Sequence, residues 1–345
     1  MTIAADMALC LSQRSIYDAR FAAGSYDKRS AVPVLLSERE TLQESFRRVL
    51  RANDDSAVIS MCDFGYGSGR VTNEFLINYV TDSACGAKDL RVLAYDVSSN
   101  GLRCGVDHLR QSGAFEIRRE PVWHSEEISG YIAGSIVSKK RSPVVTVVFV
   151  HGNEADTPAE MRDLLQGANE GHLVHLTTSW YSGLAHVSNP DRRHQYVSEL
   201  GALTVAKGEL ILSVPSLGDL KHHRFSASVS GGASSRKWRS LRMPLQDAFY
   251  ETELGQQNYC HLFGEDLIAM MASVTGPTQD WWIKAIRFPD PEFTSDAEAL
   301  RNYRRVARLN VRKGAKRWTV RDFAKCHTVA AIRSGAVRGP QTECR

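Results

Sequence analysis

Short apolar runs alternate with amphipathic helical patterns along this chain of 345 residues. The run Val144–Val150 is continuous and rich in β-branched residues, which is typical of a strand buried on both faces of a parallel sheet. Four other runs end at Asp63, Asp96, Trp180 and Ser216, with helical patterns between them. Strands that alternate with helices predict an α/β fold, with a doubly wound, mostly parallel sheet and helices on both faces.

A glycine-rich turn follows the first predicted strand. The strand ends at Asp63, and Gly65, Gly67 and Gly69 then alternate before a helical pattern that begins beyond Arg70. Glycines let a backbone adopt positive φ and approach a ligand, and the free N–H groups of the next helix face the same place. A dinucleotide site requires Gly-x-Gly-x-x-Gly, but the third glycine here comes one residue early. An ordinary turn of an α/β protein is the competing interpretation.

The arrangement Asp63-x-Gly65-x-Gly67-x-Gly69 resembles motif I of the class I S-adenosyl-L-methionine (SAM) dependent methyltransferases of the small-molecule, natural-product type. The resemblance implies a Rossmann-like sheet of seven strands, SAM as the cofactor and S-adenosyl-L-homocysteine (SAH) as the product. It places these four residues and Arg70 around the methionine end of SAM. Asp63 would face a cationic amino group, whereas it would repel a phosphate.

Two later turns extend the resemblance toward the rest of the cofactor. Asp96 ends the second strand, where a carboxylate can accept both ribose hydroxyls, and Val97 lies beside it. In the third turn the family carries an acid that holds the adenine amine, and here Asn153 stands at that position with Glu154 next to it. The resemblance therefore assigns Asp96 and Val97 to the ribose side, and Asn153 and Glu154 to the adenine.

The loop after the fourth strand is expected to face the transferred methyl group, because ligands of open α/β sheets bind outside the carboxyl ends of the strands. Ser179 is placed in the cofactor site, and Trp180 and Tyr181 are expected to wall a flat aromatic substrate. His186 is the candidate general base, because an ordinary imidazole pKa of about 6.5 suits proton transfer at neutral pH. Core packing for the aromatic residues, and a backbone hydrogen bond for His186, are the alternatives.

The N-terminal segment supplies two more candidate catalytic residues. Tyr17 and Tyr26, each followed by an aspartate, lie in a stretch that resembles the cap that such enzymes fold over cofactor and substrate. A surface loop is the alternative. The capping box Ser37-x-x-Glu40 predicts the start of a helix that continues to about Ala52.

Three regions are expected along the chain: an N-terminal helical cap over 1–52, a SAM-binding core over 53–290 and a basic helical C-terminal extension over 291–345. Within the core, an insertion over about 115–142 has the pattern of a hairpin, and a lid loop covers about 217–248. The remaining predicted elements are a helix over Gly264–Val274, a strand over Trp281–Phe288 and tail helices over Asp296–Leu309 and Thr319–Ser334.

Composition narrows the class of protein. The content of 43% hydrophobic and 24% charged residues is that of a soluble globular protein. The sequence has no apolar run near 20 residues and no signal-type N-terminus, so a cytoplasmic location without membrane contact is expected. The seven cysteines are scattered and never form Cys-x-x-Cys, so neither a metal site nor a disulfide framework is expected. The region from Ser295 onward carries 13 basic and 4 acidic residues, a net +9, against −5 for the rest.

The resemblance implies an enzyme (EC 2.1.1.-) that methylates an O, N or C nucleophile of a small metabolite, with an aromatic acceptor from specialised metabolism favoured. Enzymes that methylate DNA-base amines or protein amides carry Asn/Asp-Pro-Pro-Tyr/Phe after the fourth strand, where this chain has Thr-Ser-Trp-Tyr. One alternative is an RNA methyltransferase that binds nucleic acid through its basic tail. Another is a scaffold that binds SAM without turnover. Assembly as a homodimer is left open.

Overall fold

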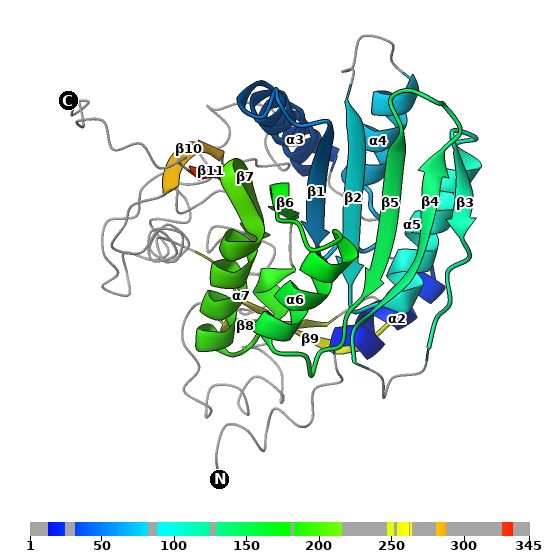
Figure 1. Ribbon diagram of the computed structural model, residues 1–345. Helices are drawn as coiled ribbons and strands as arrows, with labels where there is room; N and C mark the ends of the chain where they lie inside the picture. The colour runs from blue at the N-terminus through cyan, green and yellow to red at the C-terminus, as the bar shows by residue number, and fades with distance from the viewer. Residues whose placement is uncertain are drawn as a thin grey trace, which may run out of the picture.

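A parallel sheet forms around the first predicted strand in the computed structural model. Strand β1 (Val58–Phe64) pairs in parallel with β2 (Asp89–Asp96) on one side and with β6 (Val174–Ser179) on the other. Beyond them lie β5 (Val145–His151) and β7 (Thr204–Pro215), also parallel (Figure 1). The structure describes residues 13–24, 32–81, 88–124, 129–180, 183–215, 247–251, 254–261, 263, 281–287 and 326–333.

The order β5-β2-β1-β6-β7 is that of a doubly wound Rossmann-like sheet, with the third, second, first, fourth and fifth strands side by side. The chain moves outward from β1 through β2 to β5, and then returns to place β6 on the other side of β1. The direction therefore reverses between β1 and β6. In such sheets a ligand binds at this switch point, outside the carboxyl ends of the strands.

The full sheet has nine strands in the described residues, two more than the predicted seven. The predicted insertion is indeed a hairpin, and its strands β3 (Phe115–Arg119) and β4 (Tyr131–Ser138) join the sheet antiparallel beyond β5. At the opposite edge β11 (Cys326–Arg333) pairs antiparallel with β7, and β10 (Trp281–Arg287) pairs with β11. The hairpin thus accounts for the difference in strand number.

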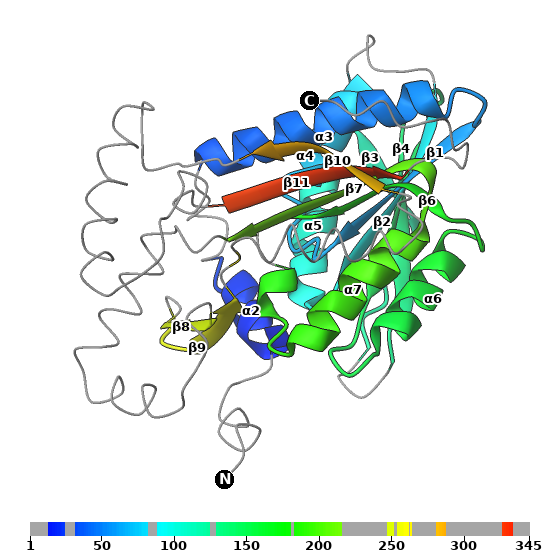
Figure 2. The same cartoon turned by 90° about the vertical axis from the view of Figure 1, so that its left-hand side faces the viewer.

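Helices cover both faces of the sheet, as predicted. Figure 2 shows α3 (Val32–Ala52) and α4 (Thr72–Thr81) above it and α6 (Pro158–Ala168) and α7 (Pro190–Leu203) below it. The side chains of α5 (Ser99–Gln111) join the same core as those of α3 and α4. No helix among the described residues is long and apolar enough to cross a bilayer.

Two smaller elements lie at the carboxyl ends of the parallel strands (Figures 1 and 2). Helix α2 (Gln13–Ala22) crosses this end of the sheet, and the hairpin of β8 (Asp247–Glu251) and β9 (Gln257–His261) lies beside it. A single 3₁₀ turn, η2 (Leu184–His186), follows β6. The switch point of the sheet is therefore surrounded by segments from both halves of the chain.

The C-terminal prediction was wrong in one part. Residues 326–333 were expected within a helix over Thr319–Ser334, but they form β11 between β7 and β10. The run His-Thr-Val-Ala-Ala-Ile suits a strand equally well, and pairing on both of its edges decides the outcome. This segment therefore belongs to the sheet and not to a helical extension, so the predicted boundary at 290/291 separates paired strands.

The start of α3 was also predicted wrongly. The helix begins at Val32, before the capping box at Ser37 and Glu40. A proline in the first turn costs no hydrogen bond, because the first N–H groups of a helix have no helical partner. The strand predicted over Trp281–Phe288 is confirmed as β10. The helices predicted over Gly264–Val274 and Asp296–Leu309, and the lid loop up to residue 246, lie outside the described residues.

A paired charge fixes α3 to the sheet. Both carboxylate oxygens of Glu209 on β7 accept hydrogen bonds from the guanidinium of Arg48, at 2.7 and 2.8 Å, and the Glu209 side chain is only 1% exposed. Removal of the cation would leave a buried carboxylate without its counter-charge. Such a loss costs about 3 kcal/mol, the low end of the usual range, because the Arg48 side chain is a quarter exposed.

We therefore expect Arg48→Met to lower the free energy of unfolding by about 3 kcal/mol in urea titrations. Arg51→Met is the matched control, because Arg51 lies one turn away on α3, is exposed and bonds only a backbone carbonyl. A loss for Arg48→Met no larger than that of the control would contradict this account of the pair.

Candidate functional site

The three glycines of the turn adopt a backbone conformation that other residues rarely take. Their φ angles are +77° at Gly65, +55° at Gly67 and +71° at Gly69. The turn crosses from β1 to the end of β2, where the N–H groups of Gly65 and Tyr66 both donate to the carbonyl of Tyr95 at 2.9 Å. The sequence pattern of alternate glycines therefore corresponds to alternate left-handed residues.

Two of these glycines also make room for aromatic rings. A Cβ at Gly69 would overlap the ring of Tyr66, whose hydroxyl donates to Asn73. A Cβ at Gly67 would lie 3.2 Å from the ring of Phe21 on α2, and one at Gly101 on α5 would lie 2.9 Å from the same ring. Phe21 thus packs into a notch between the glycine turn and the first turn of α5.

Asp63 lies behind the turn and is almost fully buried. Its carboxylate accepts from Thr72 Oγ1 at 2.5 Å and from Thr178 Oγ1 at 3.1 Å. Burial raises its pKa to about 7, and the nearby Asp96 acts in the same direction, although both threonine bonds favour the ionised form. An acid whose pKa is raised by burial and by a second carboxylate would be stabilised in its ionised form by a cation.

Asp96 ends β2 and points into the turn. Its two oxygens accept from the N–H groups of Gly67 and Ser98, each at 2.7 Å. Burial raises its pKa to about 6, against the lowering effect of these bonds, and the charge of Asp18 raises it further. Two acids with raised pKa values therefore lie on neighbouring strands at the switch point.

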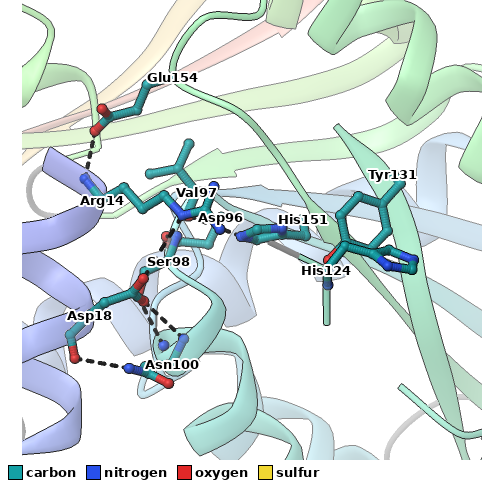
Figure 3. A network of polar contacts seen from close by, with 11 residues as sticks. Arg14, Asp18, Asp96, Val97, Ser98, Asn100, His124, Tyr131, His151 and Glu154 are labelled. Carbon is teal, nitrogen blue, oxygen red and sulfur yellow. Dashed lines mark hydrogen bonds and ion pairs between the residues drawn. The ribbon is translucent and has the colours of Figure 1, made fainter. Parts of the chain in front are cut away.

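Helix α2 is attached to both sides of this site, as Figure 3 shows. On one side, Asp18 accepts from Ser98 Oγ at 2.6 Å and from the N–H of Asn100 at 3.0 Å, and Ser98 itself caps α5. On the other side, the N–H of Arg14 donates to the carboxylate of Glu154 at 2.5 Å. The helix therefore bridges the loops that follow β2 and β5.

The insertion hairpin contributes an aromatic wall around His151, at the end of β5. The imidazole Nε2 donates to the carbonyl of Val97 at 3.1 Å, and the rings of Trp123 and Tyr131 meet it edge to face at 6.3 and 5.3 Å (Figure 3 labels Val97, His151 and Tyr131). Burial is the main reason that the pKa of His151 falls to about 4, so the ring is neutral at pH 7.

The structure brings together two of the predicted catalytic residues. The hydroxyl of Tyr17 on α2 lies 2.5 Å from Nε2 of His186 in η2, and the other ring nitrogen, Nδ1, lies 2.6 Å from the carbonyl oxygen of Tyr259 on β9. A carbonyl can only accept, so Nδ1 carries the proton. Nε2 of the neutral ring then accepts from the phenol. The other two aromatic candidates, Tyr26 and Tyr181, lie outside the described residues.

Ser179 and Trp180 lie at the carboxyl end of β6, and both are buried. Trp180 packs in the core that α3 and α4 cover, which favours the interpretation as a core aromatic. The Ser179 hydroxyl and the Trp180 indole N–H have no hydrogen-bond partner among the described residues. Unpaired buried donors of this kind are rare in native structures, so each requires an explanation such as an ordered water, an ion or a catalytic role.

The remaining predicted cofactor residues already have protein contacts. Arg70 lies 3.9 Å from the buried carboxylate of Glu38 on α3. Asn153 shapes its own turn, with its amide oxygen accepting from the N–H of Ala155 at 3.0 Å. Glu154 contacts α2, as described above. Arg70, Asn153 and Glu154 are thus each held by contacts within the protein.

Sequence reasoning missed the residues that attach α2 to the site. Arg14, Asp18, Ser98 and Asn100 form this attachment, and His151 forms the junction with the insertion. Asp18 was noted only as part of a Tyr-Asp pair. For Ser98 and His151 the sequence held one signal, because both lie just after the end of a predicted strand. It held none for Arg14 and Asn100.

Comparisons with known proteins find similarity among solved structures. No family model matches the sequence, and no curated protein matches it. The similar solved structures include a SAM-dependent methyltransferase from Methanosarcina mazei, with 10% identity and a TM-score of 0.43 over 81% of this chain and 93% of that chain. Another is DhpI in complex with SAH, with 11% identity and a TM-score of 0.43 over 94% and 97%.

A third similar structure is the plantazolicin methyltransferase BamL, in complex with a triazolic desmethylPZN analogue and SAH. Its identity is 12% and its TM-score 0.42, over 93% of this chain and 90% of that chain. With TM-scores below 0.5, these likenesses assign no activity to this chain.

The notch for Phe21 leads to a test of how α2 is held. Alanine in place of a helical glycine usually stabilises a protein by about 1 kcal/mol. At Gly101 the new methyl group would meet the Phe21 ring, so we expect Gly101→Ala to destabilise the protein and to speed hydrogen exchange of α2. In a Phe21→Ala background the same change should be neutral or stabilising, which a double-mutant cycle measures. Equal effects of Gly101→Ala in the two backgrounds would show that the ring does not occupy the notch.

Proposed function

We propose that this chain is a SAM-dependent methyltransferase that transfers a methyl group to an O, N or C nucleophile of a small, aromatic metabolite. The observation that carries the proposal is the pair of carboxylates with raised pKa values, the buried Asp63 and the partly buried Asp96, at the carboxyl ends of β1 and β2. Two acids whose pKa values are raised by burial favour a positively charged ligand. They oppose the pyrophosphate that the glycine turn of a dinucleotide enzyme would bind.

The residues around the switch point suit the parts of the cofactor. The Asp96 carboxylate accepts from the N–H groups of Gly67 and Ser98, and a backbone bond from Val97 also stabilises its charge. A carboxylate has about four acceptor sites, so we propose that it also accepts from the two ribose hydroxyls. Asp63, the three glycines and Arg70 are the proposed contacts of the methionine end. Val97 is proposed on the ribose side, and Asn153 and Glu154 on the adenine side. The Ser179 hydroxyl, which has no hydrogen-bond partner among the described residues, is available to a bound cofactor.

SAM supplies an electrophilic methyl group to the reaction, and the chain must orient the acceptor, exclude water and remove a proton where the acceptor carries one. Tyr17 and His186 are the proposed proton acceptors. As the Tyr17 hydroxyl proton passes to Nε2 of His186, the phenolic oxygen can take the proton of the acceptor. The carbonyl of Tyr259 then stabilises the charged imidazolium through Nδ1–H.

We propose the ring of Tyr17 on α2 as a contact of the aromatic substrate. The guanidinium of Arg20 lies 5.3 Å from the centroid of this ring. Trp180 packs in the hydrophobic core, so we do not include it among the proposed substrate contacts. Tyr181 is still proposed to contact the substrate, and Tyr26 is still proposed as a catalytic residue. We propose no role for a membrane.

The alternative as an RNA methyltransferase rests on the basic tail. One predicted helix of that tail is instead the strand β11, inside the sheet, which weakens the picture of a free arm. A scaffold that binds SAM without turnover has the same cofactor contacts, and only turnover separates it from the enzyme. The decisive experiment incubates the protein with SAM labelled in its methyl group and, in parallel, with metabolite extract or with RNA. A labelled metabolite is the expected product, whereas labelled RNA or no product would favour the alternatives.

The raised pKa values predict how cofactor affinity changes with pH. Below pH 6 Asp63 is largely protonated and Asp96 is more than half protonated in the free protein, and a cationic ligand must displace these protons. The affinity for SAM should therefore rise between pH 5.5 and 7.5 and level off above pH 7.5. Below its pKa, each group contributes a rise of up to about tenfold per pH unit. Calorimetry across this range measures the effect. Asp63→Asn should flatten the upper part of the rise, and an affinity independent of pH in the wild type would contradict the assignment.

Two substitutions separate binding from catalysis. Asp96→Ala removes the proposed acceptor of both ribose hydroxyls, and with charge-assisted bonds worth about 1.5–3 kcal/mol each, SAH affinity should fall at least about tenfold. His186→Ala should leave SAH affinity unchanged and slow methyl transfer by about 10²-fold or more. Calorimetry and methyl-transfer rates measure the two effects, with circular dichroism to confirm the fold. Unchanged SAH affinity for Asp96→Ala would mean that the ribose lies elsewhere.

A further inference from the structure

Arg193 is a buried cation whose partners carry no charge. It lies in the first turns of α7 with 5% of its surface exposed. Its Nη1 donates to the carbonyls of Val187 at 2.6 Å and Ser188 at 3.3 Å, and to the hydroxyl of Tyr259 at 3.1 Å. Within the described ranges, no carboxylate lies at ion-pair distance from it. A guanidinium held only by neutral oxygens is costly to bury, so its position requires an explanation.

The partners of Arg193 belong to the two segments that fix His186. Val187 and Ser188 follow His186 directly in the chain, at the end of the η2 turn. Tyr259 provides the carbonyl that accepts from Nδ1 of His186. One nitrogen of Arg193 therefore holds both the backbone next to the imidazole and the residue that carries its hydrogen-bond acceptor.

The contact with the Tyr259 hydroxyl distinguishes this arrangement from a simple turn cap. Bonds to the carbonyls of Val187 and Ser188 would be enough to satisfy the end of a 3₁₀ turn. The third bond connects to β9, 66 residues further along the chain, so that the side chain of Arg193 joins η2, α7 and β9. We call these bonds of Arg193 the joint. It lies on the Nδ1 side of His186, whereas Tyr17 lies on the Nε2 side.

We propose that Arg193 is a positioning residue that, together with the Tyr259 hydroxyl, holds His186 in the Nδ1–H tautomer with Nε2 directed at Tyr17. This inference rests on the proposed function, in which Nε2 takes the proton of the Tyr17 hydroxyl while the phenolic oxygen takes that of the acceptor. Without the joint, the ring can move away from the Tyr259 carbonyl. The Nε2–H tautomer is then open to it, and a protonated Nε2 cannot accept from Tyr17.

The test observes the tautomer directly and needs no acceptor molecule. The full-length protein is labelled with ¹⁵N-histidine, and the His186 signals among the 11 histidines are assigned by their loss in His186→Gln. Long-range ¹H–¹⁵N spectra at a pH where the ring is neutral then report which nitrogen carries the proton. The variants are Arg193→Met, Arg193→Lys and Tyr259→Phe, the last of which removes the hydroxyl and keeps the backbone carbonyl.

We expect the wild type to show a protonated Nδ1 and an unprotonated Nε2. Arg193→Met and Tyr259→Phe should shift both ¹⁵N signals toward the values of a ring that exchanges between tautomers, and Arg193→Lys should restore part of the wild-type pattern. Arg162→Met is the matched control, because Arg162 pairs with Glu199 across α6 and α7 and with Asp163 at the surface. Its spectrum should match the wild type.

A His186 ring that keeps the single Nδ1–H tautomer in both Arg193→Met and Tyr259→Phe would overturn the proposal. The same shift in Arg162→Met would overturn it too, because it would reflect a general loosening of α7. If Arg193→Met does not fold, Tyr259→Phe decides the question. Calorimetry with SAH is run on every folded variant, and affinities within twofold of the wild type are expected. Absence of SAH binding by the wild type would count against the proposed function, while the tautomer result would still decide the role of Arg193.

Discussion

The structure depends on the convergence of negative charge at the carboxyl ends of two neighbouring parallel strands. β1 and β2 run side by side in register, so Asp63 and Asp96 reach the same edge of the sheet. Each carboxylate is solvated by the protein, one by threonine hydroxyls and the other by backbone N–H groups. These bonds stabilise the charges only in part, since both pKa values remain raised. The edge is therefore suited to a cation.

Helix α2 turns this edge into an enclosed site. Its contacts are both polar and apolar: Asp18 accepts from an N–H in the first turn of α5, Tyr17 bonds to His186 and Phe21 fills the glycine notch. The attachment adds a third carboxylate, Asp18, close to Asp96, and its charge raises the pKa of Asp96 further. Closure by α2 thus increases the negative potential at the switch point, and a positively charged ligand would relieve it. Binding and closure are expected to favour each other for this reason.

Much of the sheet could be predicted from the sequence, because the cues are local. The run predicted over Val144–Val150 is confirmed as β5 (Val145–His151), and the turn after β1 has its three positive-φ glycines where the alternation indicated them. The contacts of α2 could not be predicted in this way. Tyr17 and His186 are 169 residues apart, and their hydrogen bond depends on how a helix lies across strand ends. The strand β11 was mistaken for a helix because its run of residues fits both patterns, and pairing with β7 and β10 decides between them.

The account depends on the preference of this edge for a cationic cofactor over an anionic one. Calorimetry of the wild-type protein at pH 7.5 with SAM, and separately with NAD⁺ and ATP as pyrophosphate-bearing ligands, tests that preference most directly. The account predicts that SAM binds with one site per chain and that neither pyrophosphate ligand displaces it. The account would be contradicted if millimolar SAM gave no heat of binding, or if NAD⁺ or ATP competed with SAM.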